Sequence, residues 1–205
     1  VVVYAIIRDF GAAAQAGFGV GMRVMQAIFL PVIAIAFAVA PVVGQNFGGR
    51  QGARVRQSFY SAIAITSGIM VVLTLLCQIA PDRLIRAFSE DASVIRFGSD
   101  YLRIVSFNFL AVGIVFTSSS GFQGIGNTWP PLISSAIRLL IFVLPAVIMS
   151  RMAGFDIKHV WYLSVATILF QAGANWLLLQ REFRKKLVFP EGDALPAVTG
   201  TATAA

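Results

Sequence analysis

The sequence has a single cysteine, Cys77, and a single histidine, His159. One cysteine excludes a disulfide within the chain, and neither residue has a partner at the spacing that a metal site needs. Because the chain offers no nucleophile–base pair and no metal cluster, it has no catalytic constellation. We therefore expect no enzyme activity, no metal and no cofactor.

Long polar stretches are also missing, since only 12% of the residues are charged. A nucleic-acid groove needs basic and polar stretches interleaved with aromatics, whereas the sixteen Lys and Arg residues gather at the edges of apolar segments. The glycines Gly17, Gly19 and Gly21 resemble a dinucleotide loop, but no strand-like run precedes them. The sequence thus argues against nucleic acid and nucleotides as partners.

Apolar residues dominate instead, at 58% of the chain with a mean hydropathy of +0.81. This is more apolar surface than a soluble domain can cover, so lipid must be the solvent for most of it. Most of the charge-free segments reach the roughly 20 residues that cross a bilayer core. They are residues 24–49, 57–81, 104–137, 139–150 and 160–180. The pattern predicts an all-α fold, a polytopic transmembrane helix bundle in a lipid bilayer.

Turn residues divide the chain into six expected helices within a transmembrane lobe, residues 1–187. Gly48, Gly49 and Gly52 supply the conformational freedom for a reversal, and Pro81 ends another segment. After it, Ser89 or Asp91 is the expected cap of the fourth helix. Residues 188–205 are small, polar and Pro-containing, which is typical of a disordered tail. The helices are expected at about 1–9 (truncated), 12–47, 53–80, 91–123, 131–152 and 157–186.

The basic residues set the expected orientation. Because consecutive helices alternate in direction, the loops after the second, fourth and sixth helices lie on one side of the membrane and carry seven Lys and Arg residues. The other side also carries seven, without counting Arg23, which is not assigned to a side. The first set is clustered beside helix ends, whereas the second is scattered among acids. We therefore expect the C-terminus to be cytoplasmic. The chain also begins at Val1 without a methionine or a leader, which predicts that it is part of a longer protein.

Two motifs carry a resemblance to a known family. Residues 40–49, APVVGQNFGG, end a long helix and follow Arg23 and Pro31; residues 122–128, FQGIGNT, precede Pro131 and Arg138. In order, spacing and helix count, residues 1–187 resemble the C-terminal six-helix lobe of a MATE (multidrug and toxic compound extrusion) transporter. The motif residues with an expected structural role are Pro31, Pro41, Gly44, Gln45, Asn46, Gly48, Gln123, Gly124 and Gly126.

The resemblance implies a secondary active antiporter in the bacterial inner membrane. Such a protein exports cationic or amphipathic drugs in exchange for H⁺ or Na⁺, by rocking of two six-helix lobes. The partners implied are the lipid bilayer, small organic cations and an N-terminal lobe outside this chain. A lipid-linked oligosaccharide flippase of the same broad superfamily is the alternative, and a purely structural helix bundle is a third.

Some MATE members hold their coupling ion with carboxylates on the first and fourth helices of this lobe, but residues 104–126 contain no acid. The coupling carboxylate is therefore expected in the absent half. The substrate-cavity candidates have competing structural interpretations: Arg138 as a snorkelling anchor, Thr117 bonded to its own helix and Phe116 packed or facing lipid. The candidates are Gln26, Asn108, Phe116, Thr117 and Arg138.

Overall fold

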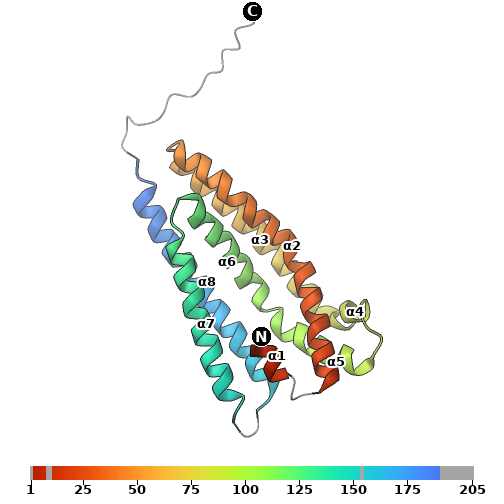
Figure 1. Cartoon of the computed structure of the whole chain (residues 1–205). Coiled ribbons are helices and arrows are strands. Elements are labelled where there is room, and N and C mark those ends of the chain that lie inside the picture. The colour runs from red at the N-terminus through yellow and green to blue at the C-terminus, as the bar shows by residue number, and fades with distance from the viewer. Residues whose placement is uncertain (1, 8–10, 153–154, 190–205) are drawn as a thin grey trace, which may run out of the picture.

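The computed structural model describes residues 2–7, 11–152 and 155–189. In these ranges the chain forms eight helices and no strand (Figure 1). Residues 1 and 8–9 of the first predicted helix, and residues 190–205 of the predicted disordered tail at 188–205, lie outside the described residues. The helices are α1 (Val2–Ile7), α2 (Ala12–Gly48), α3 (Gly52–Ile79), α4 (Pro81–Arg86), α5 (Ala92–Val105), α6 (Asn108–Gly124), α7 (Trp129–Met149) and α8 (Ile157–Lys186).

Within the described residues, α2, α3, α7 and α8 are each long and apolar enough to cross a membrane. The pair α5 and α6 supplies a fifth span if it is counted as one broken helix. At 37 residues, α2 reaches about 55 Å, which exceeds the bilayer core. Pro31 and Pro41 lie inside α2 without ending it, which is tolerated in membrane helices because neighbouring groups satisfy the freed carbonyls.

The prediction of one continuous helix over residues 91–123 is wrong. The chain bends by 55° between α5 and α6. Two side chains of α3 bind the backbone at this break: Thr74 Oγ1 donates to the carbonyl oxygen of Ser106 at 3.1 Å, and Gln78 Nε2 donates to that of Arg103 at 2.8 Å. The tertiary contact with α3 therefore satisfies carbonyls at the bend, which is the condition for a broken helix in lipid.

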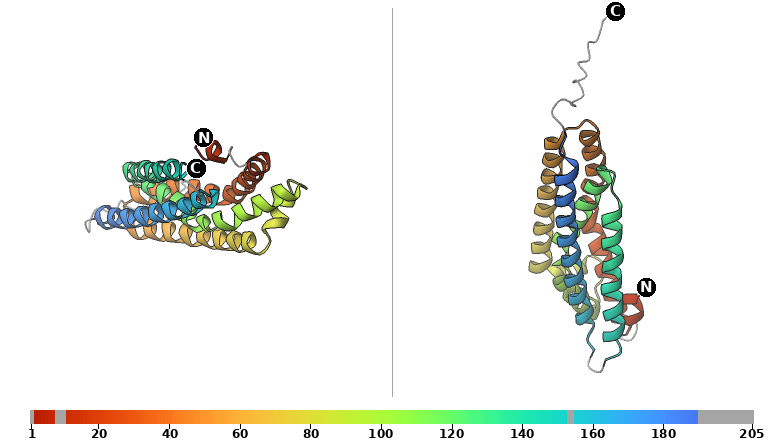
Figure 2. Two further views of the ribbon diagram at one scale, coloured as in Figure 1. Left: turned by 90° about the horizontal axis from the view of Figure 1, so that it is seen from below. Right: turned by 90° about the vertical axis from the view of Figure 1, so that its left-hand side faces the viewer.

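The long helices run roughly along one common axis (Figure 2). Helix α6 lies at the centre and packs on α2, α3 and α8, α2 also packs on α3 and α5, and α7 packs mainly on α8 at the edge of the bundle. One buried cluster joins α2, α5 and α8 around Phe18, Tyr101 and Trp161, and another joins α2, α3 and α8 around Val43, Phe59 and Phe183. Many large apolar side chains on α3 and α7 remain exposed, as lipid-facing residues must be.

The basic residues that were expected to share a side do lie together. The end of α8 meets both of the other loops: Lys186 Nζ donates to the carbonyl oxygen of Ile125 at 3.4 Å, and a Cβ built on Gly52 would lie 2.9 Å from the carbonyl oxygen of Leu187. Figure 1 shows these three segments at its upper end. One end of the bundle therefore carries Arg50, Arg54, Arg56, Arg181, Arg184, Lys185 and Lys186.

Candidate functional site

The two sequence motifs meet where α2 and α6 end. A Cβ built on Gly124 would lie 2.6 Å from Val43 Cγ1 and 2.9 Å from the carbonyl oxygen of Ala40. A Cβ built on Gly44 would lie 3.4 Å from the carbonyl oxygen of Gly124. The missing side chain of Gly124 thus lets the backbones of α2 and α6 approach closely. Gly48, the second glycine of the G-x-x-x-G pattern, has nothing within 4 Å of a built Cβ among the described residues.

Both motif helices end with the same pair of backbone hydrogen bonds. After α6, the amide of Asn127 donates to the carbonyl of Phe122 and that of Gly126 donates to Gln123, with Gly126 at φ +71°. This is a Schellman cap, in which the left-handed residue favours glycine. After α2, the left-handed residue is Arg50 at φ 55°. The expectation that Gly48 and Gly49 supply the reversal is therefore wrong.

The polar motif residues have local roles or face outward. Asn46 Nδ2 donates to the carbonyl of Val42, one turn earlier in its own helix, at 2.8 Å. The expected structural role of Asn46 is therefore local to α2. Gln45, Gln123, Pro31 and Pro41 are exposed.

A pocket of about 310 Å³ lies between helices α1, α2, α5, α7 and α8. Its walls are mostly apolar and aromatic, and Arg138 is the charged side chain among the described residues that line it. Phe18 and Tyr101 stack edge to face at 5.1 Å between ring centroids, and Tyr101 and Trp161 do so at 5.4 Å. The lining residues are Val3, Phe18, Met22, Tyr101, Val105, Arg138, Phe142, Val160, Trp161 and Ser164.

Arg138 lies close to the middle of the membrane helix α7. It is nine residues beyond Trp129, or about 14 Å along the axis of a helix of 21 residues. Its Nε is buried and has no hydrogen-bond partner among the described residues. The ion pairs of the described chain, Lys158–Asp100 and Lys186–Glu182, do not include it. A charge at this depth is costly, which marks it as a candidate functional group.

Of the five predicted cavity residues, the structure brings Arg138 to this pocket and Asn108 to its border. Asn108 Nδ2 donates to the hydroxyl of Ser164, a lining residue, at 3.4 Å. The Oδ1 of Asn108 is buried without a partner among the described residues.

The other three candidates lie elsewhere. Thr117 is fully buried, with its hydroxyl 3.2 Å from that of Thr66 on α3. Phe116 is 39% exposed and Gln26 is exposed, and neither lines the pocket. Their role as substrate contacts stays a prediction.

Sequence reasoning missed Trp161, Tyr101 and Ser164. Each lies among other polar residues, with Asp100 beside Tyr101 and Lys158 near Trp161, so the sequence carried no signal that singled it out. Trp161 is the most informative, because the side chain is only 2% exposed and its Nε1 has no hydrogen-bond partner among the described residues. A tryptophan usually finds an acceptor when it is buried.

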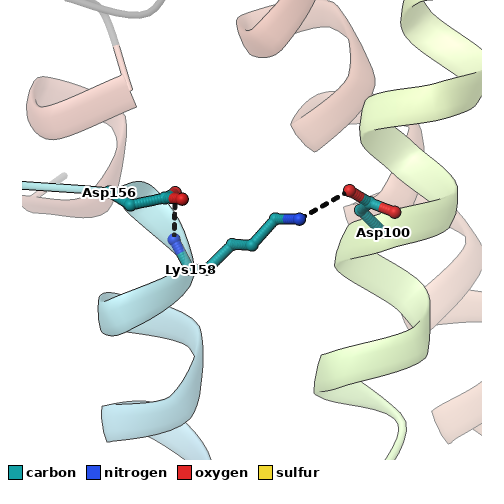
Figure 3. Close-up of polar contacts among 3 residues, drawn as sticks. All are labelled: Asp100, Asp156 and Lys158. Atoms are coloured by element: carbon teal, nitrogen blue, oxygen red, sulfur yellow. Dashed lines mark hydrogen bonds and ion pairs between the residues drawn. The ribbon is translucent and has the colours of Figure 1, made fainter.

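Acidic groups in the described residues lie toward the ends of the bundle. Asp100 on α5 accepts from Lys158 Nζ on α8 at 2.9 Å (Figure 3), and both side chains are substantially exposed. Asp156 caps α8 by accepting from the amide of Lys158, and its own amide donates to His159 Nδ1 at 3.2 Å. The single histidine is thus part of a helix cap.

Asp91 caps α5, and it is one of the two residues, Ser89 and Asp91, that were predicted as the cap. Its side chain accepts from the hydroxyl and the amide of Ser93 and from the amide of Val94. These hydrogen bonds, that of the Ser93 hydroxyl first, lower the pKa of the Asp91 carboxyl from its ordinary value. The carboxylate therefore stays ionised and caps the helix at neutral pH.

Four of the described helices are long and apolar enough to span a membrane, and the bundle packs around an apolar pocket with one charged group at mid-span. These features define a polytopic α-helical membrane protein with a ligand-sized pocket between its helices. The all-α transmembrane bundle predicted from composition is confirmed.

The family model described as MatE matches residues 1–148. The chain belongs to the MatE family of membrane transporters, which confirms the resemblance that its two motifs indicated. The relatives are transporters and not enzymes, so the expectation of no enzyme activity is confirmed as well.

Curated relatives and solved structures agree with this assignment. The probable multidrug resistance protein NorM of Thermotoga maritima is 27% identical over 191 residues, covering 89% of this chain and 40% of that protein. A protein named FAD transporter, from Shewanella oneidensis, is 23% identical over 144 residues, covering 70% and 32%. The structure titled as an outward-facing multidrug resistance MATE family transporter has a TM-score of 0.83 at 19% identity, covering 92% and 43%. The chain spans less than half the length of these proteins.

Proposed function

We propose that the protein containing this chain is a secondary active antiporter that exports cationic or amphipathic organic compounds in exchange for H⁺ or Na⁺. The observation that carries the proposal is the match of the MatE family over residues 1–148, together with relatives named for multidrug resistance. The chain forms one lobe, and a second lobe packs against it. Rocking of the two lobes exposes a central site to each side of the membrane in turn.

The charge distribution supports an orientation in the bacterial inner membrane with a cytoplasmic C-terminus. Seven basic residues cluster beside helix ends where α8 finishes, and such clusters of Lys and Arg favour the cytoplasmic side, although the other side has as many basic residues. The opposite end mixes acids and bases, including the Lys158–Asp100 pair. A fusion of green fluorescent protein to the C-terminus tests this, because it fluoresces only if that end is cytoplasmic.

The coupling carboxylate belongs to the other lobe. Within the described spans, Asp100 and Glu182 lie in the end regions and pair with lysines, and α6 and α7 contain no acid. A coupling ion would therefore find its carboxylate outside these helices. If substituting every membrane acid of the first lobe leaves coupled transport intact, this part of the proposal fails.

The experiment is dye efflux from cells that express the full-length gene. Ethidium export is compared with that of cells carrying an empty vector, with the proton and sodium gradients collapsed separately. Export that stops with one gradient supports the antiporter and identifies its ion. Absence of export of several unrelated cations, with the protein confirmed in the membrane, overturns the proposal.

The lipid-linked oligosaccharide flippase is not favoured. The relatives above are named as multidrug resistance proteins and as an FAD transporter. Such flippases tend to need a cationic cavity for a pyrophosphate, and the described pocket offers a single cationic side chain among mostly apolar walls.

A further inference from the structure

We propose that the pocket between α1, α2, α5, α7 and α8 binds an aromatic carboxylate, with Arg138 and Trp161 as donors to the carboxylate oxygens. The pocket is the one of about 310 Å³ described above. This inference rests on the proposed function in one respect: it names a class of substrate for this lobe of the proposed transporter.

The hydrogen-bonding groups of the pocket define the polarity of its ligand. Arg138 and Trp161 both line it, and both carry side-chain N–H groups that can donate but not accept. The Nε of Arg138 and the Nε1 of Trp161 are each buried without a partner among the described residues. Leaving a buried donor unsatisfied is costly, so the complementary ligand brings acceptors.

The charge of the ligand follows from the depth of Arg138. The backbone of Arg138 lies about 14 Å along a membrane helix of 21 residues, close to its middle. Intramembrane cations pair with an acid or face a water-filled cavity. None of the described residues that line the pocket is acidic. A carboxylate supplies both the missing countercharge and two oxygens for the planar fork of an arginine.

The same guanidinium disfavours a cation in this pocket. The rings of Phe18, Tyr101, Phe142 and Trp161 could otherwise attract an organic cation through their faces. A like charge in a space of about 310 Å³ opposes that attraction, because the apolar walls weaken dielectric screening. The rings instead supply an apolar surface for the body of an aromatic anion.

The size of the pocket limits the ligand. A volume of about 310 Å³ is at the lower end of the range for small-molecule sites. One or two fused rings with a carboxylate fit this space, and a large polycyclic drug does not. The pocket is thus a small subsite within this lobe.

Two probes of equal shape and opposite charge test the proposal: 1-naphthoate and 1-naphthylmethylammonium. Equilibrium binding of each radiolabelled probe is measured on the purified full-length protein in detergent, so that transport is not needed. We expect saturable binding of the naphthoate and at least a tenfold weaker binding of the ammonium compound, because loss of one charged hydrogen bond costs about this factor.

The variants separate the two donors from general damage. Arg138→Gln removes the charge, and roughly tenfold or greater loss of naphthoate binding is expected. Arg138→Lys keeps the charge and should retain part of the affinity. Trp161→Phe removes the indole N–H and leaves a smaller aromatic ring, and it should weaken binding several-fold. Arg151→Gln is the matched control, because Arg151 is exposed just beyond the end of α7 and outside the pocket.

The outcomes are distinct. Equal binding of both probes, or binding that Arg138→Gln leaves unchanged, overturns the proposal. If Arg138→Gln fails to fold, the comparison of the two probes on the unmodified protein and the Trp161→Phe variant still decide. If the protein exports ethidium but does not bind naphthoate, the proposed carboxylate site is overturned. Arg138 then pairs with an acid of another segment. Naphthoate binding without ethidium export supports the pocket and contradicts the proposed function.

Discussion

A Cβ built on Gly44 lies 3.4 Å from the carbonyl oxygen of Gly124, although helices α3, α4 and α5 and nearly all of α6 separate the two glycines along the chain. The contact joins the end of α2 to the end of α6, the two places where the family motifs occur. The motifs therefore describe one structural junction between two helices that pack at backbone distance.

This junction predicts unequal effects of two alanine substitutions. Gly124→Ala places a methyl group 2.6 Å from Val43 Cγ1 and 2.9 Å from the carbonyl of Ala40, so α2 and α6 must separate. Overpacking of this kind costs typically about 1–3 kcal/mol. Gly48→Ala is the control, because a Cβ there meets none of the described atoms within 4 Å. The monodisperse fraction that survives heating should fall for Gly124→Ala alone; equal survival of both variants would contradict the packing.

The helix cap after α6 predicts a second cost. Gly126 has a φ of +71°, where a residue with a Cβ loses roughly 1–2 kcal/mol. Gly126→Ala should therefore lower heat resistance even though a Cβ there has open space around it. Gly19→Ala is a matched control, since Gly19 also has open space but lies inside α2. A Gly126→Ala protein as stable as Gly19→Ala would rule out strain as the reason for glycine.

The cap of α5 predicts a dependence on pH. Hydrogen bonds hold the pKa of Asp91 below its ordinary value in the folded protein. Its stabilising effect is therefore complete above the unfolded pKa, about 3.9, and is lost as the pH falls through the lower folded value. Asp91→Asn keeps a capping side chain without this titration.

The measurement is heat resistance of the purified protein at pH 6 and at about pH 3. The unmodified protein should lose more stability on acidification than Asp91→Asn does, whereas Asp91→Ala should be weaker at both values. Identical pH profiles for the unmodified protein and Asp91→Asn would show that the cap does not contribute to acid sensitivity.

The pair of Lys158 and Asp100 links α8 to α5 at 2.9 Å, with relative side-chain exposures of 45% and 39%. Exposed pairs contribute about 0–1 kcal/mol, so Lys158→Ala alone should change stability little. The reversal Lys158→Asp should be worse because it places two acids together, and Asp100→Lys in the same protein should restore stability. The double-mutant cycle measures this coupling. Failure of the second substitution to rescue the first would show that the pair does not join the two helices.

Much of the architecture could be predicted from the sequence because it depends on local composition. Charge-free segments of sufficient length become membrane helices, and five of the predicted helical segments correspond to single helices within a few residues. The cap at Asp91 and the cap glycine Gly126 follow from local chemistry in the same way. The shared side of the basic loops follows from the alternation of helices.

The candidate site could be predicted only in part. Arg138 was identifiable because a charge inside an apolar helix is rare. Asn108 was identifiable for its amide, yet nothing in its own segment shows that it reaches Ser164 on α8. Trp161 was not singled out, because a tryptophan in an apolar helix ordinarily packs or faces lipid. Its missing hydrogen-bond partner is visible only when the surrounding helices are in place.

The sequence by itself determined that the chain is a membrane protein, which segments are helical and which family it belongs to. These features could be read from the sequence because hydropathy, helix caps and motifs depend on a few neighbouring residues. Only the tertiary structure decided the bend between α5 and α6, which side chains of α3 support, and the left-handed conformation of Arg50. It also decided that Arg138 and Trp161 line one pocket. These features depend on which helix faces arrive together, and that is set by packing between segments distant in the chain.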